Sequence, residues 1–528
     1  MAAKDMFLLE VFRNLASSVA GEMGVALQRA AFSPNIKERK DHSCAVFDPQ
    51  GGLVAQAEHI PVHLGAMPAT VRAVLEGFEL AEGDIFILND PYLGGTHLPD
   101  ISMVSGVFSG GELSAVLATR AHHSDVGGIA PGSLPLSSDI HQEGLVIPPL
   151  LLYRAGVRDE SFMRLLSANV RTPAERLGDI DAQVAAHRVG ERRLERIFGR
   201  YGTTETLTRF GDLQYYSEAL TRAALSAVPR GSYSFTDYLD DDGFGATDLP
   251  IAVKIEMSGG DAVVDFSGTS GPSRGPFNCP VSVTMSAVYY AFRCIAGDGV
   301  PANEGAFRPI EVRIPEGCLL DARRPRPVAG GNVETSQRIV DVLFGALAQA
   351  LPDRIPAASY GTMSNLSLGS APGAPEVFSY YETIAGGTGA GPGFDGLSGT
   401  QAHMTNTMNT PVEALEYSYP LRVKEYRLRR GSGGGGEYRG GDGIVRELEA
   451  LEEVRATLLA ERRARGPYGL EGGKRGARGK DEVIHGGRPH KIASKGSVTL
   501  EPGDSIRIST PGGGGWGVKA KHRKGAAR

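Results

Sequence analysis

The sequence predicts a mixed α+β fold of several layers whose C-terminal part is rich in glycine and β-structure. Segments with apolar residues at every third or fourth position, typical of amphipathic helices, are interspersed with short runs rich in Val, Ile and Phe, which favour strands. Of the 528 residues, 41% are hydrophobic, enough to bury a core, and the length suggests about three or four domains. Glycine accounts for 71 residues, nearly twice the roughly 7% of average proteins, so much of the backbone must turn tightly or pack closely.

The N-terminal part is expected to begin with a helix and continue as antiparallel strands. Apolar residues from Leu8 to Leu27 predict an amphipathic helix that ends before Ser33. The segments CAVF and LVAQA flank the turn residues DPQGG and predict a hairpin. Three further β-rich runs follow, at 84–88, 100–108 and 112–119.

Two long helices are predicted after these strands. Thr172 suits an N-cap, Pro173 the first helical position and Glu175 the third, and together they start a helix that runs towards Arg200. A second helical pattern covers about 205–228. The Gly/Pro-rich segment 126–138 that precedes them is long enough to be a lid or a binding loop.

The remaining chain is expected to form a middle α/β part and a β-rich end. Strands at about 231–267, with a hairpin turn at 258–261, are followed by helical runs near 283–295 and 334–350. Beyond residue 411 short β-like segments alternate with glycine-rich turns, and the stretch 431–443 is interpreted as a β-hairpin platform because no phosphate-loop motif is present. The expected parts are 1–230, 231–410, 411–517 and a basic tail, 518–528.

Composition excludes several classes of protein. Lys and Arg total 55 against 61 for Asp and Glu, and a net charge of −6 indicates neither nucleic-acid binding nor an acidic disordered chain. The basic tail is expected to be a frayed terminus, with nucleic-acid binding as the alternative. Four scattered cysteines favour a reducing cytoplasm, and apolar runs are too short or interrupted to span a membrane.

A cluster of histidines in the first 141 residues predicts a metal site. His97 and Asp100 lie three residues apart between two predicted strands, and His122 ends the strand that follows. If these strands pair as an antiparallel meander, the three side chains reach the same edge of the sheet. Two histidines and one carboxylate are a common ligand set for a catalytic Zn, Mn or Fe ion. The alternative is that these groups only cap and hydrogen-bond the loops.

Other polar residues near this segment are secondary candidates. Asp125, His141 and Glu143 could orient the ligands or act as general acids or bases. His59 and His63 have the spacing of a helical metal pair, but the intervening Pro61 argues against a helix, so His63 is interpreted as a substrate-pocket residue instead.

Eight separated segments resemble the hydantoinase B/oxoprolinase family, from about residue 5 to residue 517. They are AFSPNIKERKDHSCAVFD, HIPVHLGAMP, FILNDPYLGGTHLPDI, RAHHSDVGGIAPGS, QEGLVIPP, NVRTPAERLGDIDAQ, GGNVETSQRIVD and HMTNTMNTPVEALE. The resemblance implies a hydantoinase A-type partner, separate or fused, that binds ATP and Mg. Related acetone carboxylase α subunits hold a metal through an H-x-x-D pair and a later histidine, which here match His97, Asp100 and His122.

The resemblance further implies the role of an N-methylhydantoinase B-type subunit in a cytoplasmic hetero-oligomer. The implied reaction is ATP-dependent hydrolysis of a small cyclic amide: hydantoin, 5-oxoproline or a lactam. An ATP-dependent ketone carboxylase of the acetone or acetophenone type is the alternative, although the chain lacks the extra length of the acetone carboxylase α subunit; a non-catalytic scaffold is the third. No nucleic-acid or membrane partner is expected.

Site residues for this reaction are also expected. Proton transfer is assigned to His123, Asp125 or Glu143, although His123 is equally an alternative ligand or a substrate contact. His63, together with His403, Asn406 and Asn409 of the segment HMTNTMNTPVE, would bind the substrate ring. The alternative for the two asparagines is that they hold a tight turn.

Overall fold

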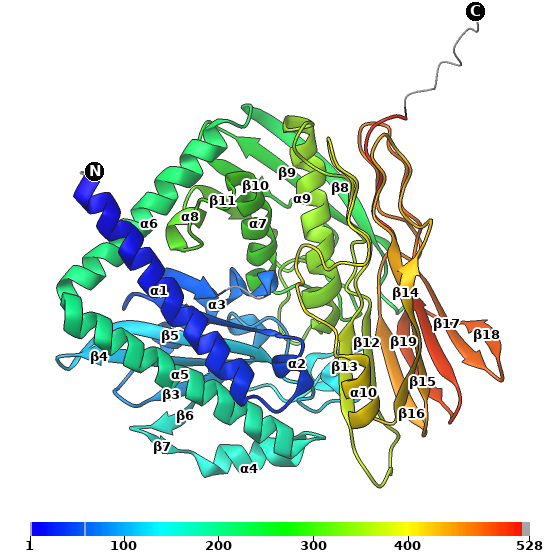
Figure 1. The fold of residues 1–528 in the computed structure, drawn as a ribbon, viewed down its shortest axis with the longest axis horizontal. Coiled ribbons are helices and arrows are strands. Elements are labelled where there is room, and N and C mark those ends of the chain that lie inside the picture. The colour runs from blue at the N-terminus through cyan, green and yellow to red at the C-terminus, as the bar shows by residue number, and fades with distance from the viewer. Residues whose placement is uncertain (1–2, 58–59, 520–528) are drawn as a thin grey trace, which may run out of the picture.

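The computed structural model describes residues 3–57 and 60–519, and it confirms a mixed α+β fold (Figure 1). A seven-stranded antiparallel sheet forms the N-terminal part, with the order β2-β1-β5-β4-β3-β6-β7. Its strands are β1 His42–Phe47, β2 Leu53–Ala57, β3 Ile85–Leu88, β4 Asp100–Ser109, β5 Glu112–His122, β6 Leu150–Arg154 and β7 Val157–Arg158. The expected meander of β3, β4 and β5 is therefore confirmed.

Helices cover both faces of this sheet because its strands alternate apolar side chains between two cores. On one face Leu117 packs with the long helices α1 (Ala3–Ala30) and α5 (Pro173–Tyr201), which cross the strands in Figure 1. On the other face Val116 packs with α3 (Ala66–Gly77). Successive residues of a strand point to opposite faces, so each residue of β5 is assigned to one core or the other.

The start of α5 differs in detail from the sequence prediction. Pro173 is at the first helical position as expected, but the Thr172 side chain makes no capping hydrogen bond to the backbone. Its hydroxyl instead accepts a hydrogen bond from Arg176 Nη1 at 3.2 Å. The helix α6 follows at Thr203–Ser226, and the shorter helices α2 (Pro34–Lys37) and α4 (Glu160–Asn169) complete this part.

In the middle part, the helix Ser336–Ala350 packs on a four-stranded sheet of order β11-β10-β9-β8, and the helix Val281–Ala296 packs on that helix. Its strands are β8 Gly231–Asp241, β9 Thr247–Met257, β10 Ala262–Asp265 and β11 Ile310–Arg313, and its helices are α7 Val281–Ala296, α8 Glu304–Phe307 and α9 Ser336–Ala350. The turn at 258–261 joins β9 and β10 as an antiparallel pair, as predicted. The α-helix predicted from 334 begins at Ser336, because Gly331–Thr335 forms one turn of π-helix.

Two further sheets enclose a third apolar core at the C-terminal side of the molecule (Figure 1). One has the order β13-β12-β16-β19 and the other β14-β15-β20-β17-β18. The elements are β12 Asn365–Ser370, β13 Ser379–Thr383, α10 Val412–Ser418, β14 Leu421–Arg429, β15 Gly443–Ala450, β16 Val454–Leu459, β17 Lys480–His485, β18 Arg488–Lys491, β19 Lys495–Leu500 and β20 Ser505–Ser509. Since β12 pairs with β16, one sheet takes strands from both sides of the boundary expected at 410/411.

The glycine-rich segment 431–443 is the loop of the antiparallel hairpin of β14 and β15, but it forms no ladder of its own. Between residues 431 and 442 the structure has only a single-residue bridge, from Tyr438 to Trp516. The segment instead packs backbone against backbone with 387–389 and 512–515: a Cβ on Gly440 would lie 2.0 Å from the carbonyl oxygen of Gly513. Gly434 N–H donates to that same oxygen at 2.8 Å. Glycine is required here because a side chain would occupy the space of the neighbouring chain.

Three other expectations concern the surface and the termini. Most of segment 126–138 is buried, and Gly132 N–H donates to Ser379 Oγ at 3.0 Å, so the segment is a packed connection and not a lid.

Within the described residues, no helix combines the length and the apolar character that crossing a lipid bilayer requires. His59 and residues 520–528 of the basic tail lie outside the described residues.

Candidate metal centre

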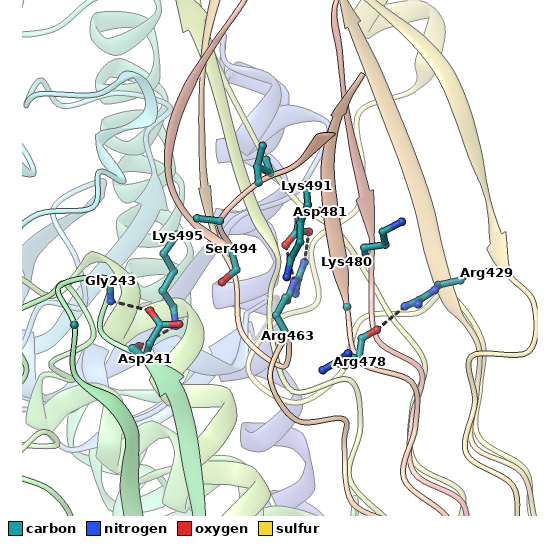
Figure 2. A pocket seen from close by; sticks show the side chains of 14 residues that line it. Asp241, Gly243, Arg429, Arg463, Arg478, Lys480, Asp481, Lys491, Ser494 and Lys495 are labelled. Carbon is teal, nitrogen blue, oxygen red and sulfur yellow. Dashed lines mark hydrogen bonds and ion pairs between the residues drawn. The ribbon is translucent and has the colours of Figure 1, made fainter. Parts of the chain in front are cut away.

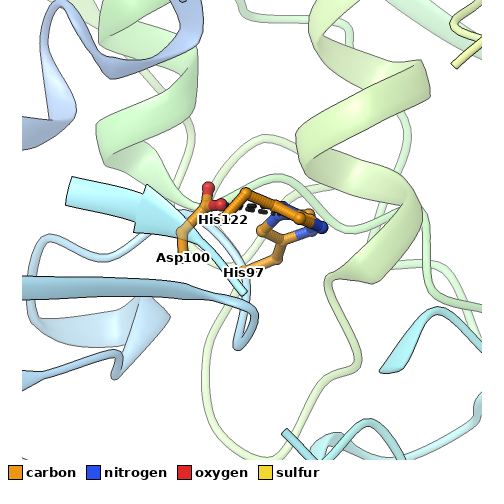
Figure 3. A group of neighbouring side chains, drawn as sticks. All are labelled: His97, Asp100 and His122. Carbon is orange, nitrogen blue, oxygen red and sulfur yellow. Dashed lines mark hydrogen bonds and ion pairs between the residues drawn. The ribbon is translucent and has the colours of Figure 1, made fainter. Parts of the chain in front are cut away.

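His97, Asp100 and His122 converge at the edge of the seven-stranded sheet (Figure 3). Asp100 begins β4 and pairs directly with His122 at the end of β5. His97 reaches the same point because the turn before β4 closes through a hydrogen bond from Asp100 N–H to the His97 carbonyl, at 3.0 Å. The two strand ends and one tight turn thus bring the three side chains together.

The donor atoms of this cluster have the spacing of ligands around one ion. His97 Nε2 lies 3.0 Å from His122 Nδ1 and 3.1 Å from Asp100 Oδ1, and His122 Nδ1 lies 2.9 Å from Asp100 Oδ1. The same three atoms lie within hydrogen-bonding distance of one another, and a cation held by all three would replace these hydrogen bonds. All three side chains are buried, and the donor set suits Zn, Mn or Fe. The residues therefore fit the metal that the sequence predicts.

The charge states of the cluster also suit a cation. Burial lowers the pKa of both His122 and His63, which keeps these imidazoles neutral with a lone pair to offer. Burial opposes ionisation of Asp100, but its electrostatic interaction with His97 and hydrogen bonds from the histidines outweigh it and hold the pKa of this carboxyl well below its usual value. A neutral imidazole at His122 and an ionised carboxylate at Asp100 are the protonation states that metal binding requires.

A small cavity of about 20 Å³ adjoins the cluster, which is room for about one water molecule. Besides the three candidate ligands, it is lined by Asp41, Ile60, Val62, His63, Asn332, Val333, Met363, Tyr381, Thr383, Met404, Thr405 and Thr407. His63 Nε2 is 3.6 Å from Asp100 Oδ2, and His63 Nδ1 is 2.9 Å from Ser43 Oγ. His63, expected in the substrate pocket, therefore lies beside the candidate ligands.

The three residues expected to transfer protons do not line this cavity. His123 follows His122 but faces the other side of the sheet, where its Nε2 is 3.0 Å from Gln183 Oε1 on α5. Burial lowers the pKa of His123 to about 4. Asp125 is buried and forms an ion pair with Arg171 at 2.7 Å.

Glu143, the third of them, anchors the backbone that leads into the π-helix. Its Oε1 accepts hydrogen bonds from Ser137 Oγ at 2.6 Å and from the N–H of Val328 at 2.9 Å. Its Oε2 is buried without a hydrogen bond among the described residues, and burial raises the pKa of Glu143 to about 7.

The segment HMTNTMNT contributes to the cavity through residues other than those predicted. Thr405 and Thr407 line it, whereas Asn406 between them is exposed. Asn409 Nδ2 donates to the carbonyl of Thr383 at 3.3 Å, and His403 Nδ1 is 3.4 Å from Tyr290 Oη. The segment therefore lies at the cavity, but Met404, Thr405 and Thr407 line it, and the predicted His403, Asn406 and Asn409 do not.

Sequence reasoning missed Asp41, Asn332 and Tyr381 as cavity residues. The Asp41 carboxylate has no hydrogen bond or ion pair with a side chain that the structure describes, and burial raises its pKa. The ring of Tyr381 stacks on that of His122, with centroids 4.8 Å apart and an angle of 24°. Asp41 and Asn332 lie in segments quoted for the family resemblance, which was the available signal; Tyr381 lies in none of them.

The fold and the site together define a class of protein: a multi-sheet α+β chain with a buried cluster of two histidines and one carboxylate at a sheet edge. The chain belongs to the hydantoinase B/oxoprolinase family, whose model matches residues 5–519.

Relatives cover nearly the whole chain. An uncharacterised protein of Methanocaldococcus jannaschii is 40% identical over 97% of this chain and 91% of its own length. 5-Oxoprolinase 1 of Arabidopsis thaliana is also 40% identical, but the match spans only 42% of that longer protein. A Pseudomonas protein named as a D-/L-hydantoinase component is 31% identical over 97% of this chain and 90% of its own length.

Two solved structures share the fold. The ATP-dependent caprolactamase of Pseudomonas jessenii superposes with a TM-score of 0.89 at 31% identity, covering 97% of this chain and 91% of the caprolactamase chain. An acetone carboxylase superposes with a TM-score of 0.87 over 97% of this chain and 75% of its own. Its identity of 19% makes it a likeness of fold alone.

Proposed function

We propose that this chain carries the ring-opening site of an ATP-dependent hydrolase of small cyclic amides such as hydantoin, 5-oxoproline or a lactam. The observation that carries the proposal is the buried cluster of His97, Asp100 and His122 beside the Asp41 and His63 side chains. Relatives named for 5-oxoprolinase, hydantoinase and caprolactamase activity support this substrate class.

His97, Asp100 and His122 would hold one divalent ion. When bound, such an ion supplies Lewis-acid polarisation of a carbonyl oxygen and lowers the pKa of water from 15.7 towards roughly 7. Arg39 supports the cavity wall next to these residues: its guanidinium carbon lies 4.8 Å from the centroid of the Tyr381 ring, which stacks on His122.

Two further side chains of the cavity are suited to handle protons. Asp41, whose carboxylate is unpaired among the described side chains, is placed to accept the proton of an attacking water molecule. The proton taken up by Asp41 would pass to the ring nitrogen as the C–N bond breaks. His63, which burial keeps neutral, would relay it by accepting a proton on one ring nitrogen while donating from the other. Asp41 and His63 thus replace His123, Asp125 and Glu143 in the proposed chemistry.

The cavity is too small for a substrate in the form described. A five- to seven-membered ring is several times larger than the single water molecule that about 20 Å³ admits. Its wall includes Thr405, which lies in the segment 405–411 without helix or strand. We infer that part of this wall moves aside when the ring enters.

A hydantoinase A-type protein would supply the ATP chemistry. An amide carbonyl resists attack, and transfer of phosphate from ATP to its oxygen would make it a better electrophile. This partner, with its ATP and Mg, would be a separate subunit of a cytoplasmic hetero-oligomer or a fused domain, as the greater length of the 5-oxoprolinases illustrates.

Co-expression with a hydantoinase A-type protein tests the proposal. We expect ring-opened product from 5-oxoproline, hydantoin or caprolactam only with both proteins and ATP, and about one divalent ion per chain by elemental analysis. The variant His97→Ala should lose the bound ion and form no ring-opened product. The matched control His141→Ala, at an exposed position, should keep the ion and the activity.

Three outcomes would contradict the proposal. If turnover without the partner or without ATP equals that of the complete system, then the partner does not supply the ATP chemistry and the proposal is wrong. Incorporation of labelled bicarbonate into the product would favour the ketone carboxylase. Absence of metal together with full activity of His97→Ala would leave the scaffold role.

A further inference from the structure

A second, larger cavity lies far along the chain from the candidate metal centre. Its volume is about 680 Å³, within the range of roughly 300–1,000 Å³ that small-molecule sites occupy. It is bounded by the β8–β9 turn, by strand β17 and by the segment 491–495 (Figure 2). Six of its lining residues are basic and two are acidic: Arg429, Arg463, Arg478, Lys480, Lys491 and Lys495, against Asp241 and Asp481.

The inner basic residues are already neutralised. Arg463 forms two hydrogen bonds to Asp481, at 2.9 and 2.8 Å. Lys495 Nζ lies 2.6 Å from Glu461 Oε1 and 3.3 Å from Asp241 Oδ2, and this lysine side chain is only 2% exposed. Each of these two inner cations therefore has at least one carboxylate partner and carries no uncompensated charge.

The outer basic residues are not neutralised, apart from Lys480, which pairs with Glu482. Arg429 is partly buried and donates only to the carbonyl oxygens of Arg478 and Thr510, at 2.8 and 3.0 Å. The side chains of Arg478 and Lys491 make no hydrogen bond or ion pair with any residue that the structure describes. Three uncompensated positive charges therefore face one cavity, and their mutual repulsion would be relieved by an anion.

We propose that this cavity binds a small ligand with clustered negative charges, of the diphosphate or phosphate-ester class. Guanidinium groups match phosphate oxygens in paired hydrogen bonds, and lysine adds a mobile point charge. The concave shape favours a small ligand over an acidic protein surface. No aromatic side chain is among the lining residues, so the phosphate groups, not a nucleobase, would supply the affinity.

Titration calorimetry on the full chain with inorganic pyrophosphate at low ionic strength tests the site. We expect a dissociation constant below about 1 mM that weakens as salt is added. The double variant Arg478→Ala/Lys491→Ala should bind at least about tenfold more weakly, since it removes two of the three uncompensated charges. Both side chains are exposed and without partners, so folding should be preserved, which circular dichroism checks.

The matched control is Arg192→Ala/Arg196→Ala on α5. It removes the same charge from exposed positions that do not line the cavity. It should bind pyrophosphate as the unaltered chain does. Equal affinities for all three proteins, or no binding at concentrations above about 1 mM, would overturn the proposal.

Competition then identifies the source of the phosphate. ADP should displace pyrophosphate while adenosine does not, and inorganic phosphate should bind more weakly than pyrophosphate because it engages fewer of the three charges. Displacement by adenosine as strong as by ADP would overturn the phosphate class. None of these measurements involves ring opening, so the result is independent of the proposed activity.

Discussion

Two buried polar clusters in this molecule place carboxylates next to basic side chains. One is the candidate metal site and the other is a structural ion pair. In the first, Asp100 meets the imidazoles of His97 and His122. In the second, Asp237 of β8 and Asp341 of α9 both pair with the guanidinium of Arg462, at 2.6 Å for Asp237. Both clusters are withdrawn from solvent, so burial alone does not separate a site from a structural ion pair.

The chemistry of the basic group makes the difference. A guanidinium has no lone pair to offer and stays charged, so it can only neutralise its partners. Burial opposes ionisation of Asp237, but Arg462 and Arg338 outweigh it and lower the pKa of Asp237 to about 2. An imidazole that burial keeps neutral retains a lone pair for a ligand. Both clusters contain buried nitrogens without a hydrogen-bond partner among the described residues, such as His122 Nε2 in the first and Arg462 Nη1 in the second, so only the lone pair of the imidazole separates them.

Removing His97 gives the largest expected change. His97→Ala takes one ligand from the histidine cluster, so we expect turnover of the co-expressed complex to fall roughly a thousandfold, equivalent to about 4 kcal/mol, and bound metal to be lost. The far-ultraviolet circular dichroism of the chelator-treated variant should match that of the chelator-treated parent. If His97→Ala keeps both the metal and the turnover, then the histidine cluster is not the metal site that distinguishes it from the arginine cluster.

Arg462→Met should chiefly affect stability. It leaves the buried Asp237 and Asp341 with only Arg338, 3.7 Å from each, as a counter-charge. Removing one partner of a buried ion pair typically costs about 3–5 kcal/mol of unfolding free energy. Arg465→Met is the matched control, because the ion pair of Arg465 with Asp248 is exposed and worth about 1 kcal/mol or less. Urea denaturation of both variants gives the comparison; equal losses would mean that the buried pair has no special role.

Glu143 lies in neither cluster and should respond to pH. Burial raises the pKa of its folded state to about 7 from 4.5, so the folded state keeps a proton that the unfolded chain has already lost. Its contribution to stability is fully present below pH 4.5 and lost as the pH rises through 7. Glu143→Gln mimics the protonated form and should therefore exceed the parent in stability at pH 8, on the order of 3 kcal/mol, but not at pH 4.

Denaturation curves at the two pH values measure this difference. A parallel turnover assay tests the sequence-based expectation that Glu143 transfers protons. Unchanged turnover of Glu143→Gln would mean that Glu143 has a structural role only. If this variant is no more stable than the parent at pH 8, the raised pKa of Glu143 is contradicted.

The smallest effect is expected from the neighbour of a ligand. His123→Gln changes a side chain that faces α5, so metal content should be unchanged and turnover should fall only a few-fold. The paired variant His122→Gln removes a candidate ligand one residue away and should lose metal. Elemental analysis of the two purified variants distinguishes them, and metal loss from His123→Gln would indicate that the sheet faces are wrongly assigned.

The sequence by itself determined the local structure and the candidate ligands. Helical and β periodicities placed the long helices and the meander, and a turn residue, a strand start and a strand end named His97, Asp100 and His122. The helices, the meander and the three candidate ligands could be predicted because each depends on residues within about thirty positions of one another, where turn chemistry and strand pairing act directly. The family resemblance, and not these local signals, assigned segment 403–409 to a site.

Only the tertiary structure decided which side chains face that site. Asp41, Asn332 and Tyr381 come from segments up to 340 residues apart (381 − 41), and no local preference brings them together. Met404, Thr405 and Thr407 line the cavity in place of the predicted His403, Asn406 and Asn409, because the packing of this irregular segment decides which of its side chains face inward. The glycine segments are a further case, since backbone contact between 431–443 and 512–515 exists only once both have packed.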